Sequence, residues 1–150
     1  MSEKIGKFYA WSVYEPSVVR QQQRDWAIHK RKLKTELKKI GALLKKIKFI
    51  NSGNLEAIKI AVNTINLQKF IDEIISTISK GKITHQNLED IVVVIGLFHQ
   101  RYPKFTPSLT NSLNNFFIAK IRENNILIEE TTAIATLMCE LYMQGIIWEY

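Results

Sequence analysis

The chain has 150 residues, of which 46% are hydrophobic and 23% charged, and its formal net charge at pH 7 is +7. This length is typical of one domain with a substantial core, and three prolines and six glycines leave little room for linkers or low-complexity segments. A single cysteine excludes an internal disulfide and is typical of a reducing compartment, and no apolar run approaches the ~20 residues of a membrane span. We therefore expect one soluble cytoplasmic domain without a membrane segment.

The positive charge is concentrated in one part of the chain. Between Arg20 and Lys48 there are eleven Lys or Arg residues, against only two acids, Asp25 and Glu36. The remaining residues carry ten bases and twelve acids, so the whole positive excess comes from this segment. Charge gathered in this way indicates an anionic partner more strongly than the same charge spread evenly.

Residues 1–15 form an aromatic-rich segment, and we assign residues 16–150 to the folded domain. The aromatic side chains of the segment are Phe8, Tyr9, Trp11 and Tyr14. We expect this segment to fold back on the helix that follows it, as a terminal staple. An exposed docking peptide is the alternative interpretation.

The segment from Pro16 to about Phe49 is predicted to be one long helix, stopped by Asn51-Ser52-Gly53. Its apolar residues are spaced 7, 4, 3, 4 and 3 positions apart, which makes one stripe: Trp26, Leu33, Leu37, Ile40, Leu44 and Ile47. At ~100° per residue, six basic residues gather on the opposite side: Arg20, Arg24, Arg31, Lys34, Lys38 and Lys45.

This basic face has several interpretations. It can bind RNA phosphates or an acidic protein, or it can serve only as a solubilising surface. Attachment to a membrane is disfavoured, because the apolar stripe is needed to pack on its own domain.

The rest of the chain has the periodicity of further helices. Apolar residues at helical spacing predict five more helices, over the ranges Leu55 to Ile65, Leu67 to Ile78, Leu88 to Phe98, Leu109 to Ile121, and Ile134 to Ile146. Gly81 is predicted to end the second of these helices, and Thr84 is a plausible cap for the third. No convincing strand alternation is present. Short turns between successive helices predict an all-α fold of antiparallel pairs stacked as an α-solenoid. In the last helix, the apolar neighbours of Cys139 predict a buried structural thiol rather than a reactive one.

A helix–elbow–helix corner is predicted at residues 97–109, whose sequence is Leu-Phe-His-Gln-Arg-Tyr-Pro-Lys-Phe-Thr-Pro-Ser-Leu. Pro103 ends the first helix, because it cannot continue one. Thr106 is predicted to be the N-cap of the next helix, with Pro107 at its first position. We expect His99 and Arg101 in the last turn of the first helix, where donors suit the free carbonyl groups.

The corner resembles a Leu-Phe-His-Gln-Arg-Tyr…Phe-x-Pro-Ser-Leu segment in the first MIF4G domain of the up-frameshift scaffold family of nonsense-mediated mRNA decay. Residues 66–71, Asn-Leu-Gln-Lys-Phe-Ile, are similar to the family's Asn-Leu-x-Lys-Tyr-Ile. Glu140-Leu141 with Gly145-Ile146 is similar to its Glu-Leu-x-x-x-Gly-Ile, and Lys45-Lys46-Ile47-Lys48 is a weaker match to its basic helix end. The resemblance covers about residues 40–147, and no named segment is recognised in residues 1–35.

The resemblance implies HEAT-like helix pairs and a non-enzymatic scaffold whose partners are other mRNA-decay proteins. In that family the third MIF4G domain and a separate C-terminal region hold the known partners, so their binding residues do not transfer to this chain. The family's first domain has about five helix pairs, whereas about three are predicted here, and the chain stops within an apolar helix at residues 146–150. A truncated or strongly reduced domain is therefore expected.

Known catalytic patterns are absent from the sequence, which has no glycine-rich phosphate loop, His-Glu-x-x-His, Cys-x-x-Cys or Gly-x-Ser-x-Gly. The histidines, His29, His85 and His99, have no ligand spacing, so we expect no metal, no cofactor and no small-molecule substrate. Two hypotheses remain beside the decay scaffold. One is a directly RNA-binding helical-repeat module of the translation-initiation type, and the other is a protein–protein adaptor unrelated to RNA.

Overall fold

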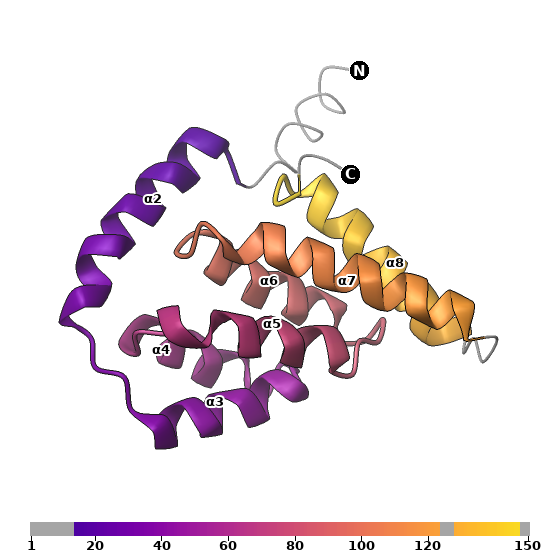
Figure 1. The fold of residues 1–150 in the computed structure, drawn as a ribbon, viewed down its shortest axis with the longest axis horizontal. Helices are drawn as coiled ribbons and strands as arrows, with labels where there is room; N and C mark the ends of the chain where they lie inside the picture. Colours follow the sequence, from indigo (N-terminus) through magenta and orange to yellow (C-terminus); the bar gives the residue numbers. More distant parts are fainter. Residues whose placement is uncertain (1–13, 124–127, 148–150) are drawn as a thin grey trace.

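The computed structural model describes residues 14–123 and 128–147, and all of its regular elements are helical (Figure 1). In chain order they are α2 (Pro16–His29), the 3₁₀ turn η1 (Lys30–Lys32), α3 (Leu37–Lys48), α4 (Leu55–Thr64), the 3₁₀ turn η2 (Gln68–Phe70), α5 (Ile71–Lys80), α6 (Leu88–His99), α7 (Phe105–Arg122) and α8 (Ile128–Met143). None of the described helices is long and apolar enough to cross a lipid bilayer.

The helices from α3 to α8 form a two-layered stack (Figure 1). In one layer α3 packs on α5 and α5 packs on α7; in the other α4 packs on α6 and α6 packs on α8. The two layers are joined by contacts of α3 with α4, of α6 with α7 and of α7 with α8. This arrangement confirms the predicted all-α fold of stacked antiparallel helix pairs.

The core runs between the two layers and consists of aliphatic side chains, with aromatic rings at the α6–α7 corner. Phe98 stacks on Phe105 with ring centroids 4.7 Å apart, and Tyr102 lies 6.1 Å from Phe98. All three rings are fully buried. Burial on this scale makes the corner part of the core rather than a surface loop.

The predicted long helix is wrong, because the chain breaks between α2 and α3. Residues 33–36 are not helical, and two hydrogen bonds join them to Asn66 at the α4–α5 corner. The N–H of Asn66 donates to the carbonyl of Lys34 at 3.3 Å, and the hydroxyl of Thr35 donates to the carbonyl of Asn66 at 3.1 Å. Hydrogen bonds across the fold thus replace those of a continuing helix.

The break also changes which residues of α3 face the core. Leu37, expected in the apolar stripe, is 73% exposed, whereas Leu43, which was not assigned to the stripe, is fully buried. Ile40 and Ile47 are buried as predicted, and Leu44 is half-buried against the core. The predicted stripe assumes one continuous helix through residues 33–36, which are not helical. Positions in α2 and α3 therefore do not share one helical face.

At the α6–α7 corner the helix boundaries differ from the prediction by two residues. Lys104, not Thr106, is the N-cap of α7, and Pro107 is its third residue. A proline is tolerated there because N–H groups of the first turn have no partner within the helix. The Thr106 hydroxyl instead pairs with Nδ1 of His99 at 2.7 Å, so His99 does not bond a helix-end carbonyl with its ring.

Three smaller predictions are also corrected or limited. Asn87, not Thr84, is the N-cap of α6, and its side chain bonds back to Thr84. Cys139 is exposed rather than buried. Of the aromatic segment, Phe8, Tyr9 and Trp11 lie outside the described residues.

Tyr14, the last aromatic residue of that segment, packs on α6 and the end of α8 rather than on the helix that follows it. Its N–H donates to the carbonyl of Gln144 at 3.3 Å, and its ring meets that of His99 edge-on at 5.7 Å. Gly96 makes room for this ring, because a Cβ at that position would lie only 2.0 Å from the Tyr14 hydroxyl.

Candidate basic interface

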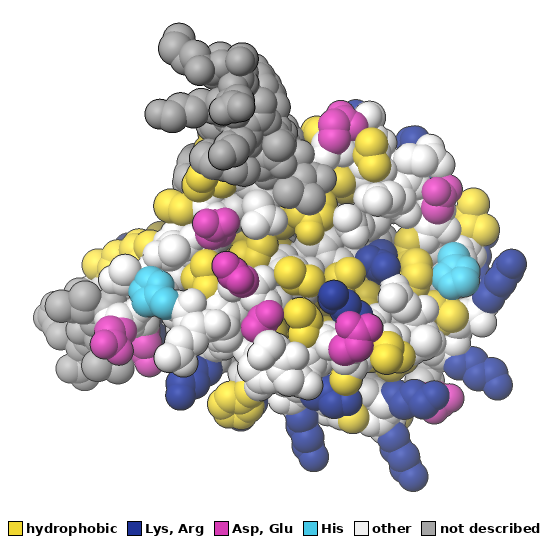
Figure 2. All heavy atoms as spheres, turned by 180° about the vertical axis from the view of Figure 1, so that it is seen from behind, with side chains coloured by type: hydrophobic (Ala, Val, Ile, Leu, Met, Phe, Trp, Pro, Cys, Tyr) yellow, Lys and Arg dark blue, Asp and Glu magenta, His cyan; other side chains and the backbone are white. Residues whose placement is uncertain are grey.

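The six predicted basic residues lie on four successive pieces of the chain rather than on one helix face. Arg20 and Arg24 are in α2, Arg31 is in η1, Lys34 is in the connection, and Lys38 and Lys45 are in α3. All six are exposed. Lys and Arg side chains gather along the edge of the molecule formed by α2 and α3 (Figure 2). We call these six residues the basic edge.

The charges of the basic edge are not neutralised by neighbours. Among the described residues, none of the six lies within 4.0 Å of a carboxylate, and the ion pair in this region joins Lys39 to Glu36 at 3.3 Å. Asp25 accepts from the amide of Gln21 at 2.9 Å, and that amide in turn accepts from Arg24 at 2.7 Å. The edge therefore offers free cationic groups to a phosphate or carboxylate.

Helix α2 crosses one end of the stack and touches all three corners there (Figure 1). At its start, Tyr14 bonds to the end of α8, and in its middle the amide of Gln23 donates to the carbonyl of His99 at 2.8 Å. Beyond its end, the carbonyl of Lys30 accepts from the amide of Asn66 at the α4–α5 corner, at 3.2 Å. Only Val19 of α2 is buried, so polar contacts carry much of this attachment.

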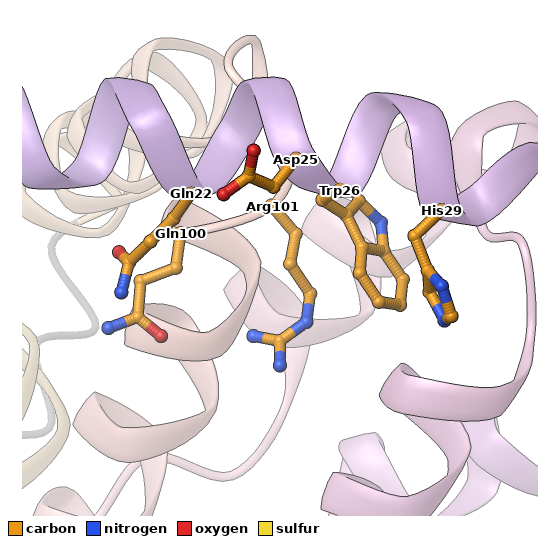
Figure 3. Close-up of a pocket in the computed structure, with 6 residues that line it drawn as sticks. All are labelled: Gln22, Asp25, Trp26, His29, Gln100 and Arg101. Atoms are coloured by element: carbon orange, nitrogen blue, oxygen red, sulfur yellow. The ribbon is translucent and has the colours of Figure 1, made fainter.

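A shallow pocket of about 310 Å³ lies between α2 and the α6–α7 corner (Figure 3). It is lined by Gln22, Asp25, Trp26, His29, Gln100 and Arg101. The Arg101 guanidinium lies over the Trp26 ring at 5.0 Å and donates to the carbonyl of Leu97 at 2.9 Å and to the amide oxygen of Asn63 at 2.6 Å. Burial lowers the pKa of Arg101.

These contacts make Arg101 a link between α2 and the stack. Arg101 was expected to bond a helix-end carbonyl, and it does so through Leu97. The stripe predicts that Trp26 faces the core, which it does in part, but not that its ring contacts Arg101. A tryptophan and an arginine 75 positions apart give no signal in a single sequence.

The histidines are spread over the fold. Within the described ranges, no group of three or more His, Cys, Asp or Glu side chains could hold a metal ion. His99 is half-buried, and burial lowers the pKa of its ring. Its Nδ1 pairs with the hydroxyl of Thr106, a residue that is itself buried.

Comparison with known proteins agrees with this architecture. No protein-family model matches the sequence. The sequence is 30% identical over 131 residues to the Arabidopsis thaliana regulator of nonsense transcripts UPF2, and 31% identical over 115 residues to the human regulator of nonsense transcripts 2. These alignments cover 83% and 77% of the chain. The chain is a relative of the UPF2 regulators of nonsense transcripts.

The fold of the chain is that of a MIF4G domain. The crystal structure of the first MIF4G domain of the human nonsense-mediated decay factor UPF2 superposes with a TM-score of 0.76, at 24% identity, over 95% of this chain and 45% of that one. The chain spans about a tenth of the curated UPF2 relatives, 11% of the Arabidopsis protein and 9% of the human one. The kinship therefore concerns one region of a much longer protein.

Three of the four segments that resemble the UPF2 family lie at the corners beneath α2. Residues 66–71 form the α4–α5 corner, residues 97–109 the α6–α7 corner, and residues 140–146 the end of α8. Gly145 has a φ of 80°, which suits glycine, and the N–H of Ile146 returns to the carbonyl of Leu141 at 2.9 Å. The sequences of these segments therefore have a structural role: they form helix ends and make the contacts that hold α2 on the stack.

Proposed function

We propose that this chain is a non-enzymatic adaptor domain of nonsense-mediated mRNA decay that acts in the cytoplasm and binds other decay proteins. The observation that carries the proposal is the sequence kinship with the UPF2 regulators over 83% of the chain. A stack of helix pairs supports it, because such stacks offer long surfaces for partners. No catalytic constellation was found in the sequence, which agrees with an adaptor.

The adaptor role is tested by removing these 150 residues from their gene and measuring mRNA decay. Two reporter messages are compared, one with a premature stop codon and one without. We expect the half-life of the first message to lengthen in the deletion strain and that of the second to stay unchanged. Equal half-lives of the first message with and without the domain would contradict the proposal.

A second candidate function is direct contact with RNA through the basic edge. It is supported by eleven basic residues against two acids between Arg20 and Lys48, and by the exposure of the six edge residues. Exposed lysines and arginines contact phosphates, which carry no sequence information. Binding is expected to be independent of sequence, with a dissociation constant of about 1 µM or weaker at physiological salt.

Fluorescence anisotropy with an unstructured RNA tests the second function. The charge reversals Arg31→Glu, Lys38→Glu and Lys45→Glu should abolish binding together and leave the fold intact. A matched control reverses Lys69, Lys80 and Lys104, which are exposed and do not belong to the six residues of the basic edge, so the net charge of the two triple variants is the same. The control should keep most of the affinity.

The dependence of RNA affinity on salt concentration tests whether the basic edge contacts phosphates. The logarithm of the association constant should fall linearly with the logarithm of salt concentration, as several neutralised phosphates require. If the wild-type chain binds no RNA in about 50 mM salt, where phosphate contacts are strongest, the RNA function is excluded. The basic edge would then be assigned to an acidic protein segment or to no partner.

A further inference from the structure

The surface of the chain between residues 18 and 49 is apolar as well as basic. Among the described residues, four of the five most exposed large hydrophobic side chains lie in this range. They are Val18, Ile28, Leu37 and Phe49, with exposed fractions of 53%, 64%, 73% and 54%. Contacts of lysine and arginine with RNA phosphates give these apolar side chains no role. The combination therefore indicates a partner that is both acidic and apolar.

Helix α3 has such side chains along one side, which we call the apolar margin. Leu37, Gly41 and Leu44 follow one another at spacings of four and three residues, so they lie within about 60° on the helix wheel. Leu37 and Gly41 are exposed, and Leu44 is half-buried against the core. Of the 36 residues that precede α3, those of α2 lie across the corners of the stack and leave the margin uncovered (Figure 1).

The fold itself gives no steric reason for a glycine at position 41. A Cβ added to Gly41 would meet no atom of another part of the fold within 4 Å. Glycine in a helix interior is less stable than alanine, because the unfolded backbone loses more freedom. A partner helix accounts for the glycine, because helices approach more closely where the side chains between them are small.

Lysines border the apolar margin. Lys38, Lys45 and Lys48 lie within about 100° of Leu37 on the helix wheel. Helix α3 contains five lysines and no acid, and none of these three lies within 4.0 Å of a carboxylate of a described residue. Their charges therefore favour carboxylates on whatever covers the margin.

We propose that the apolar margin of α3 is the docking site of an acidic amphipathic helix of a partner protein. Apolar side chains of that helix pack on Leu37 and Leu44 and over Gly41, and its carboxylates reach the bordering lysines. An amphipathic helix laid on an apolar strip is a common mode of recognition. The inference rests on the proposed adaptor function, because it names the chemistry of one partner and the surface that binds it.

Charge and shape argue against four other occupants. Residues 1–13 contain two lysines and one acid, and a second copy carries a net charge of +7, so the lysines attract neither. RNA is attracted, but phosphate contacts use neither Leu37 nor the open space at Gly41. An anionic membrane is attracted and can take up Leu37, but the missing side chain at position 41 only reduces its contact.

Fluorescence anisotropy of the full 150-residue chain with a labelled model peptide tests the proposal. The probe is a synthetic helix of about 18 residues with leucines along one side and glutamates on the others. We expect a dissociation constant of about 100 µM or tighter. Replacing the glutamates by glutamines, or shuffling the leucines around the helix, should each weaken binding at least about tenfold. A probe that does not bind at about 1 mM would overturn the proposal.

Two uncharged substitutions separate this docking from phosphate contacts. Leu37→Gln and Gly41→Gln should each weaken the peptide at least about fivefold, the second by placing a side chain on the margin. The unfolding midpoint should stay unchanged in the first variant and stay or rise in the second. The matched controls are Ile60→Gln, at a 57% exposed position of α4, and Ala42→Gln, about 100° from Gly41 on the same helix, and both should keep the affinity.

RNA and lipid vesicles supply the outcomes that assign the margin to another partner. Because Leu37→Gln and Gly41→Gln change no charge, both variants should bind unstructured RNA as the wild type does. An equal loss of RNA affinity and peptide affinity would assign the margin to RNA. Co-sedimentation with phosphatidylserine vesicles that Leu37→Gln abolishes and Gly41→Gln retains would assign it to a membrane. Either result, or equal peptide affinity of the wild type and Gly41→Gln, would overturn the proposal.

The two reporter messages of the adaptor test separate failure of this docking site from failure of the adaptor function. The double variant Leu37→Gln and Gly41→Gln should lengthen the half-life of the message with a premature stop codon, as the deletion does. If the deletion lengthens that half-life and the double variant does not, the adaptor function stands and docking at the margin is overturned. If neither does, the adaptor function is contradicted, and the peptide titration alone decides on the docking site.

Discussion

The hydroxyl of Tyr102 accepts a hydrogen bond from the backbone N–H of Leu67 at 3.1 Å, and both residues are buried. Leu67 lies at the α4–α5 corner and Tyr102 at the α6–α7 corner, so this bond fixes one helix pair relative to the next. Burial raises the pKa of the Tyr102 hydroxyl, and the Leu67 N–H partly opposes that rise. The hydroxyl is therefore protonated and neutral at pH 7. Two of the segments that resemble the UPF2 family meet at this bond.

Replacing Tyr102 by Phe should therefore destabilise the fold without changing its shape. The ring keeps its packing, but the buried N–H of Leu67 loses its acceptor, which costs about 1–3 kcal/mol. Chemical denaturation of the wild type and Tyr102→Phe measures the difference in unfolding free energy. A difference below about 0.5 kcal/mol would mean that the Leu67 N–H finds another partner.

Truncation of Phe98 at the α6–α7 corner should be costly. Its side chain is completely buried, at 0% exposure, and its ring stacks on that of Phe105. Phe98→Ala should cost about 3–5 kcal/mol, because the cavity cannot collapse between two layers. Pro107→Ala is the control at the same corner, and we expect little change because Pro107 is exposed in the first turn of α7. A thermal melt of Phe98→Ala that matches the wild type would remove Phe98 from the core.

The break between α2 and α3 makes a prediction opposite to that of the continuous stripe. Leu43→Ala should lower the unfolding free energy by about 2–5 kcal/mol, since Leu43 is fully buried. Leu37→Ala, at a 73% exposed position of the same helix, should change it by less than about 0.5 kcal/mol. Equal denaturation midpoints for the two variants, or a larger loss at Leu37, would favour one continuous helix.

The parts of the fold that follow from local pattern were predictable. The helices after residue 50 and their buried positions, such as Ile58, Ile74 and Leu137, follow from apolar spacing alone. The break in the helix at residues 33–36 could not be predicted from local pattern, because it depends on hydrogen bonds to Asn66, about 30 positions away. Exposure of Cys139 was missed for a related reason: apolar sequence neighbours point in different directions around a helix.

The candidate site was predictable in composition but not in shape. Charge counting found the basic residues, and all six are exposed. Their arrangement along an edge depends on where α2 is held, and α2 is held by contacts such as that of Trp26 with Arg101. Such contacts join residues far apart in the chain, and one sequence carries no record of them.

His99 should make the stability of the fold depend on pH. Burial lowers the pKa of its ring in the folded state, and no carboxylate of a described residue lies within 4.0 Å of it. In the unfolded chain the ring of His99 has an ordinary pKa near 6.5, so it binds a proton more readily than in the folded chain. The contribution of neutral His99 to the stability of the fold is therefore complete above pH 6.5 and is lost as the pH falls below that value. His99→Gln should remove this part of the slope, so its unfolding free energy should fall less than that of the wild type as the pH is lowered from 7 to 5.5. Unfolding free energies at several pH values measure the slope, and His85→Gln, at an exposed histidine in the α5–α6 connection, should retain it. Parallel pH profiles for the wild type and His99→Gln would show that His99 is equally easy to protonate in the folded chain.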